Sequence, residues 1–132
     1  MDRLSLSSSP QQFLHEVNFH DSGFAGYRFF GSRLHVGVDL CNYDQSWYSK
    51  GEPEIVDCEV VFHSVSGFKI SPRFFPEGRI EHPESCSILS ADFLRGAEVR
   101  MNLNWFNYST KVNDYFVLSF ETERVKMYMC KV

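Results

Sequence analysis

The sequence lacks the short motifs by which many enzymes bind phosphates or activate a nucleophile. It has no GxGxxG or GxxxxGK[ST] phosphate loop and no GxSxG motif around a serine. The four cysteines, Cys41, Cys58, Cys86 and Cys130, form no CxxC pair, which argues against a zinc site and a thioredoxin-type redox site. We therefore expect no catalytic residues, no metal ion and no cofactor.

Basic residues and long apolar runs are also scarce. The chain has 13 Lys and Arg against 17 Asp and Glu, a net charge of -4. Because a phosphate backbone requires a basic surface, we expect no nucleic-acid partner. No apolar run approaches the roughly 20 residues of a membrane span, and Met1–Pro10 lacks the apolar core of a signal peptide. We expect a cytoplasmic protein with reduced thiols and no membrane contact.

Aromatic residues and alternating patterns, by contrast, are abundant. Aromatic residues make up 16% of the chain, and 13 of them are Phe, which is typical of strands with large buried contacts. Apolar and polar residues alternate in Arg33–Cys41, Glu54–Val65, Ala97–Phe106 and Tyr115–Phe120, which predicts strands with one buried face. The residues expected in the core are Leu34, Val38, Cys58, Val60, Phe62, Val99, Leu103, Phe116 and Leu118.

One short helix is expected before the strands. Ser9 is a suitable N-cap, Pro10 suits the first helical position, and apolar residues at helical spacing predict a helix over Pro10–Val17. No amphipathic helix separates the strands, so we predict a mainly β fold, an antiparallel β-sandwich or partly open barrel with this one N-terminal helix. The length fits a single domain, residues 1–132, with residues 1–8 as a loose tail.

Two local patterns give finer expectations. Gly31-Ser32 is predicted to be a two-residue hairpin turn with glycine first. The segment Cys86–Leu94 is predicted to be a strand with Leu89, Ala91 and Phe93 on one side.

The loop from Asn42 to Glu54 is the best candidate for a binding site. It is long for a β connection, and Tyr and Trp often anchor interfaces. Between Asp39 and Glu59 six acidic residues stand against Lys50 alone, which favours a protein partner with a basic surface. The alternative is that Trp47 covers one edge of the sheet and that the acidic side chains only form a solvated surface that aids solubility. The predicted partner-binding residues are Tyr43, Asp44, Trp47, Tyr48, Glu52, Glu54, Asp57 and Glu59.

Histidines and carboxylates allow a different interpretation. The adjacent His20 and Asp21 suit a general base or a metal ligand, yet the favoured role is structural, with Asp21 capping a turn through backbone N–H groups. His35, Asp39 and His63 are predicted to lie on the exposed side of neighbouring strands. If their side chains lie close together there, they could bind a divalent metal ion.

A resemblance covers about residues 18–70. Phe19-His20-Asp21-Ser22, a hairpin ending in LHVGVDL, a Trp-containing loop and the strand CEVVFHSVSGF resemble small bacterial immunity proteins of polymorphic toxin systems. The resemblance implies a protein that binds and neutralises a cognate toxin without catalysis. The toxin-binding surface varies in such families, so it assigns no site residues.

We therefore expect a non-catalytic cytoplasmic binding protein, and the resemblance implies an immunity protein. One alternative is a small β-barrel enzyme or metal-binding protein that uses His20, Asp21, His35 or His63. Another is a structural subunit of a phage or secretion assembly. The sequence leaves the oligomeric state open.

Overall fold

The computed structural model describes the backbone of residues 2–94 and 98–131 and the side chains of residues 9–94 and 98–129. Strands dominate it, and α1 is a single short α-helix in this part of the chain. The elements are β1 (Asp2–Ser8), α1 (Pro10–Glu16), β2 (Gly23–Phe30), β3 (Arg33–Cys41), the 3-10 turn η1 (Asn42–Asp44), β4 (Ile55–His63), β5 (Ser66–Ser71), β6 (Gly78–Arg79), β7 (Glu84–Leu94), β8 (Glu98–Asn107), β9 (Asn113–Glu121) and β10 (Arg124–Lys131).

The strands form one open antiparallel sheet in the order β1-β10-β4-β3-β2-β7-β8-β9-β5, and β6 pairs with β2 beside this path. The predicted mainly β, antiparallel fold is confirmed, and the sheet does not close into a barrel. The hairpin at Gly31-Ser32 is also confirmed, since Gly31 has a φ of 62°, a conformation that glycine adopts without steric cost.

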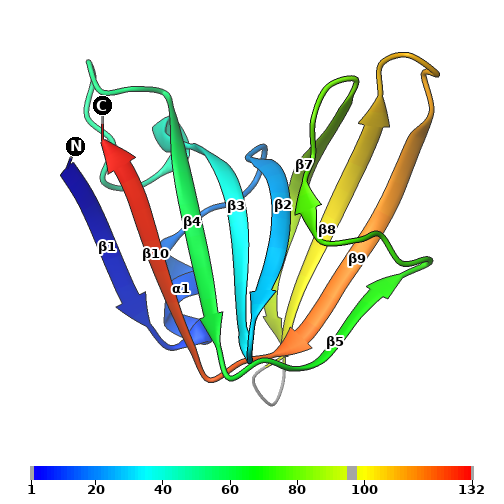
Figure 1. Cartoon of the computed structure of the whole chain (residues 1–132). Coiled ribbons are helices and arrows are strands. Elements are labelled where there is room, and N and C mark those ends of the chain that lie inside the picture. The colour runs from blue at the N-terminus through cyan, green and yellow to red at the C-terminus, as the bar shows by residue number, and fades with distance from the viewer. Residues whose placement is uncertain (1, 95–97, 132) are drawn as a thin grey trace.

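Two arms of this sheet meet at a narrow base and splay apart above it (Figure 1). The first arm is β1, β10, β4, β3 and β2; the second is β7, β8, β9 and β5. The chain passes between the arms at the base, through the β4–β5 and β9–β10 connections. Gly23 and Ser87 are the pair that joins β2 to β7.

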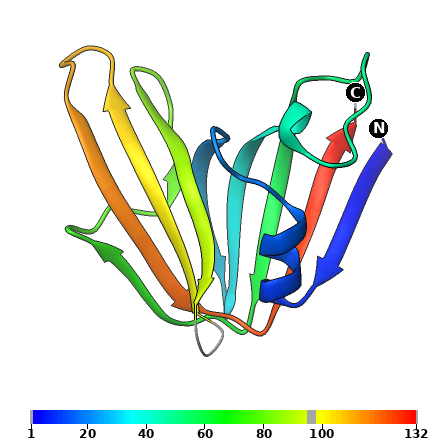
Figure 2. The same ribbon diagram turned by 180° about the vertical axis from the view of Figure 1, so that it is seen from behind.

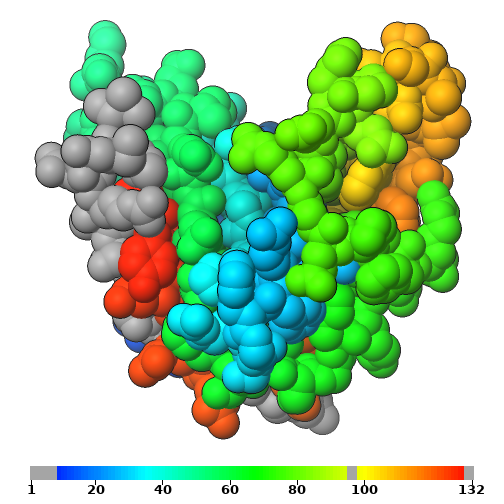
Figure 3. Space-filling model, viewed as in Figure 1, coloured from blue at the N-terminus to red at the C-terminus, as the bar shows by residue number. Residues whose placement is uncertain are grey.

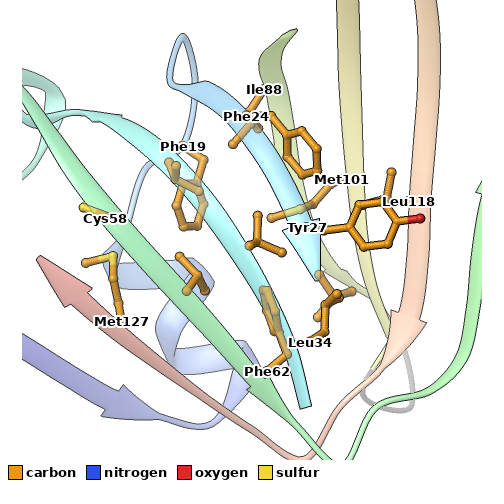
Figure 4. Packing of buried hydrophobic residues seen from close by; sticks show 14 of the residues in the cluster. Phe19, Phe24, Tyr27, Leu34, Cys58, Phe62, Ile88, Met101, Leu118 and Met127 are labelled. Carbon is orange, nitrogen blue, oxygen red and sulfur yellow. The ribbon is translucent and has the colours of Figure 1, made fainter. Parts of the chain in front are cut away.

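The core lies between the arms and under α1. All nine residues predicted to be buried are buried. Cys58 and Phe62 of the first arm and Met101 and Leu118 of the second belong to the same apolar cluster (Figure 4). One continuous core is consistent with a single domain.

Helix α1 closes the back of this core (Figure 2). The Ser9 side chain accepts a hydrogen bond from the backbone N–H of Gln12 at 3.3 Å, which caps the first turn. Phe13 and Val17 are buried in the cluster, so the apolar stripe read from the sequence faces the sheet. Within the described parts of the chain, no helix has the length and apolar character needed to cross a membrane.

The expected loose tail over residues 1–8 is wrong. Asp2–Ser8 forms β1, which pairs with β10 along its whole length. The short alternation of Leu4 and Leu6 with serines was the available signal. An N-terminal strand is ordered here because β10 offers it a ladder of hydrogen-bond partners.

The strand expected over Cys86–Leu94 forms, but Leu89 does not share a side with Ala91 and Phe93. The register of β7 against β8 shifts between Ile88 and Ser90, so Leu89 is an extra residue and is 38% exposed. Such a bulge reverses the alternation for the rest of the strand, which leaves Ile88, Ala91 and Phe93 on the core side.

Strand β6 lies beside β2 and approaches its backbone closely at Gly26. This residue has a φ of 131°, and a Cβ there would collide with the carbonyl oxygen of Gly78. Gly26 is therefore required for β6 to pair with β2, and it fixes the position of Arg79 above the outer side of the first arm.

Candidate functional site

Two buried polar residues hold the loop between β3 and β4. The Asn42 side chain donates to the carbonyl of Pro53 at 2.9 Å and accepts from the Trp47 indole N–H at 3.0 Å. The Gln45 amide donates to the carbonyls of Cys41 and Asn18 and accepts from the Asn18 N–H. Sequence analysis missed both residues. Their hydrogen bonds make the loop a fixed structure, which reduces the entropy lost on binding.

Three of the predicted partner-binding residues stabilise this loop from within. Trp47 packs half-buried against the core, as the alternative interpretation of the loop predicted. The Tyr48 hydroxyl donates to the Glu52 carbonyl at 3.4 Å, and the Glu52 carboxylate accepts from the Ser49 N–H at 2.7 Å.

The other five predicted residues are exposed but do not form a single patch. Tyr43 and Asp44 lie on η1, and Asp44 lines a hollow with His20 and Leu89 on the side of α1. A hydrogen bond with Cys41 is the main cause that raises the pKa of Tyr43 to about 12, so its phenol stays protonated. Glu54, Asp57 and Glu59 are exposed at the start of β4 and along its outer side.

Asp57 and Glu59 share the outer side of the first arm with Asp39, and we call these three residues the acidic face. Asp39 and Asp57 are directly opposite on β3 and β4. Burial raises the pKa of Asp39, the charge of Asp57 raises it further, and Arg79 opposes the shift. Neither aspartate forms an ion pair with any described residue, so their repulsion is not offset by a bonded cation.

Glu59 marks the lower limit of the acidic face. Its carboxylate lies 3.1 Å from Nδ1 of His35, and Nε2 of His35 is buried without a hydrogen-bond partner in the described structure. Gly37 lies opposite Glu59 on β3, and the missing side chain leaves a hollow of about 270 Å³ that Arg79 also lines. The hollow is open and has a carboxylate on one side and a guanidinium on the other.

Below Glu59 the outer side becomes basic. Arg28 of β2 lies opposite His35 of β3, and Arg124 of β10 lies opposite His63 of β4. Burial lowers the pKa of His63, and the charges of Arg124 and then Arg33 lower it further. The outer side of the first arm is thus acidic toward the β3–β4 loop and basic toward the base.

The His20-Asp21 pair lies elsewhere, at the turn before β2. Nδ1 of His20 lies 2.9 Å from the carbonyl oxygen of Leu89, and Nε2 lies 3.6 Å from the Asp21 carboxylate. The turn is capped by Asn18, whose side chain accepts from the His20 N–H, and not by Asp21 as expected. Asp21 has a φ of 65°, a conformation that Asp tolerates better than most residues.

The candidate metal residues are divided between two places, with His20 and Asp21 at the turn before β2 and His35, Asp39 and His63 on β3 and β4. Asp39 lies four residues along β3 from His35, about 13 Å at the rise of a strand. Among the described residues no group of three His, Cys, Asp or Glu side chains is arranged to hold a metal ion.

Sequence analysis also missed an aromatic cleft on the second arm. It has a volume of about 520 Å³ and lies between the segment around β6 and the β8–β9 turn, which stand on either side of it in Figure 3. Phe74, Trp105 and Val112 are among its lining residues. The available signal in the sequence was the pair of adjacent aromatic residues between prolines in Pro72-Arg73-Phe74-Phe75-Pro76. In the structure Phe75 is buried and Phe74 is exposed.

No protein-family model matches the chain, and no curated protein and no solved structure matches it either.

Proposed function

We propose that this domain is a non-catalytic binding protein whose acidic face, Asp39, Asp57 and Glu59, binds a basic surface of a protein partner. The single observation that carries the proposal is the opposition of Asp39 and Asp57 on adjacent strands. Two carboxylates in this position cost stability, because like charges directly opposite one another repel. A cation from a partner that binds between them removes that cost, so it interacts more strongly than with an isolated carboxylate.

The neighbouring loop supports the same function. Tyr43 is 51% exposed next to a loop that Asn42 and Gln45 hold in place. An exposed aromatic side chain on a preorganised loop is suited to anchor an interface, while carboxylates increase the association rate and the selectivity for a basic partner.

The finer proposal is that the partner is a toxin and that the domain is an immunity protein acting in the cytoplasm. Its support is the resemblance over residues 18–70, together with an acidic surface that suits a basic toxin. Binding alone suffices for neutralisation, so this function requires no catalytic group.

Association kinetics with matched peptides test the general proposal. A lysine-rich peptide should bind the immobilised protein, and a glutamate-rich peptide of equal length should not. Asp57→Lys should slow association, and the effect should shrink as salt rises. Glu121→Lys is the matched control, since Glu121 is an exposed acid on β9. Equal binding by the two variants would contradict the proposal.

Co-expression tests the finer proposal. Toxin candidates encoded beside the gene are expressed with the protein, and growth is measured. Rescue by the natural protein and by Glu121→Lys, but not by Asp57→Lys, would support an immunity function. A failure of every adjacent toxin candidate to bind the protein would contradict it.

A further inference from the structure

The floor of the aromatic cleft is a rigid cluster of rings. Phe75 is buried, and its ring centroid lies 5.0 Å from those of both Trp105 and Phe116. The Phe75 carbonyl also accepts a hydrogen bond of 2.7 Å from the Tyr27 hydroxyl. These contacts anchor the segment between β5 and β6 at Phe75, and they leave the adjacent Phe74 71% exposed.

The rim of the cleft is apolar on two sides. Phe74 lines it from the β5–β6 segment, and Val112, also exposed, lines it from the β8–β9 turn. Exposed apolar side chains that border a concave aromatic floor are typical of a pocket that receives an anchor residue. The volume of about 520 Å³ is sufficient for a large side chain with part of its backbone.

The charged side chains that line the cleft have an excess of one negative charge, with Glu77, Glu84 and Asp114 against Arg73 and Arg79. Arg73 is already engaged, because its guanidinium lies 5.0 Å from the Phe116 ring centroid and donates to Asp114 at 2.7 Å. Glu84 lines the cleft, is exposed and forms no ion pair with a described residue. A lysine or arginine beside the anchor would balance this excess of negative charge.

The cleft and the hollow beside the acidic face adjoin the same short strand, since Gly78 and Arg79, the two residues of β6, line both. A partner that lies along the acidic face therefore reaches the cleft by crossing one two-residue strand.

We propose that the aromatic cleft binds a large apolar side chain of the same basic partner that the acidic face binds. The inference rests on the proposed function and adds to it the chemistry of the partner: an aromatic or large aliphatic anchor flanked by cationic residues. The acidic face makes binding selective for a basic partner. Burial of the partner's anchor side chain in the cleft slows dissociation of the complex.

Two lysine-rich peptides that differ at one central residue provide the test. One carries Phe at the centre and the other Ser, and binding is followed by the NMR signals of the two tryptophan indole groups. The Phe peptide should bind about tenfold tighter, as expected when one anchor is buried. It should shift the indole signal of Trp105 in the cleft and leave that of Trp47 in place.

Exposed positions give variants that should still fold. Phe74→Ser and Val112→Ser should remove the tenfold preference for the Phe peptide and leave the affinity for the Ser peptide unchanged. Tyr115→Ser is the control, since Tyr115 is an exposed aromatic residue on β9 that does not line the cleft.

The outcomes separate the two proposals. If the Phe and Ser peptides bind equally and Asp57→Lys weakens both, the acidic face stands and the cleft inference is overturned. If Asp57→Lys weakens neither peptide, or neither binds, the proposed function and the inference both fail. If the protein sediments as a dimer that Phe74→Ser dissociates, the cleft is an interface between copies of this chain, which also overturns the inference.

Discussion

Nδ1 of His20 lies 2.9 Å from the carbonyl oxygen of Leu89, the residue that bulges from β7. A bulge frees backbone groups from the ladder of its sheet, and here a histidine from the preceding turn takes up the freed carbonyl. The most conspicuous pair of titratable residues in the sequence therefore binds the turn before β2 to the second arm.

The pKa values of His20 and His63 should be shifted in opposite directions. The hydrogen bond to Leu89, followed by the charge of Asp21, raises the pKa of His20 above 6.5, whereas burial and nearby arginines lower that of His63. An NMR titration should show His20 protonated at a higher pH than His63. Asp21→Asn should lower the pKa of His20 only in part, because the Leu89 contact remains, and a reversed order would contradict this assignment.

These shifts have opposite effects on stability. A raised histidine pKa stabilises the fold below pH 6.5, and that contribution is lost as pH rises through the folded-state value. For His63 the sign is reversed, so protonation as pH falls below 6.5 destabilises the fold.

Two leucines of the same sheet should respond differently to truncation. Leu103→Ala should cost about 2–5 kcal/mol, because the fully buried side chain leaves a cavity. Leu89→Ala should cost only about 0.5 kcal/mol, because the bulge exposes the side chain. Urea denaturation measures both, and similar losses would mean that the bulge is misplaced.

The charged carboxylate of Asp39 should destabilise the folded state at neutral pH. Its pKa is raised above 3.8 by burial and by Asp57, so the fold disfavours its charged form. The stability present below pH 3.8 is lost as pH rises through the folded-state pKa. Asp39→Asn should therefore raise the melting temperature at pH 7 and have no such effect in acid, where both side chains are neutral. A lower melting temperature at pH 7 would show that the carboxylate has a stabilising contact.

Substitution of Trp47 should reduce the stability of the fold much more than substitution of Tyr43. Trp47→Ala should cost about 2 kcal/mol or more, because it removes core contacts and leaves the Asn42 oxygen without its donor. Tyr43→Ala should change stability by only about 0.5 kcal/mol, because the ring is exposed.

The same two variants also test the loop as an interface. Tyr43→Ala should speed dissociation of a bound partner about tenfold if this residue is an anchor. Melting curves and dissociation kinetics on both variants make the comparison. An unchanged dissociation rate for Tyr43→Ala would remove this residue from the site.

The fold was largely predictable because its strongest signals are local. In β3 and β4 the buried face imposes an alternation that only Cys41 and Val61 interrupt. Leu34, Val38, Val60 and Phe62 therefore identify the core without knowledge of their partners. The side of Leu89 was not predictable, since the bulge depends on pairing between β7 and β8. A local pattern cannot report where a distant strand shifts its register.

The candidate site was predictable only in part, for the same reason. The sequence indicates an acidic segment, but which carboxylates face each other follows from the β3–β4 register. Trp47 turns inward because Asn42 accepts its N–H, and Phe74 turns outward because Phe75 packs on Trp105 and Phe116. Each direction is set by contacts that the local pattern does not contain.

The ladder between β2 and β7 is short: Gly23 pairs with Ser87, and Asp21 and Ser22 add hydrogen bonds to Ile88 just before β2. Side-chain packing provides the rest of the contact between the arms. The ring centroids of Phe62 on β4 and Phe120 on β9, for example, lie 4.8 Å apart in the shared core. Separation of the arms would expose that core, so we expect the whole sheet to unfold cooperatively, in one transition.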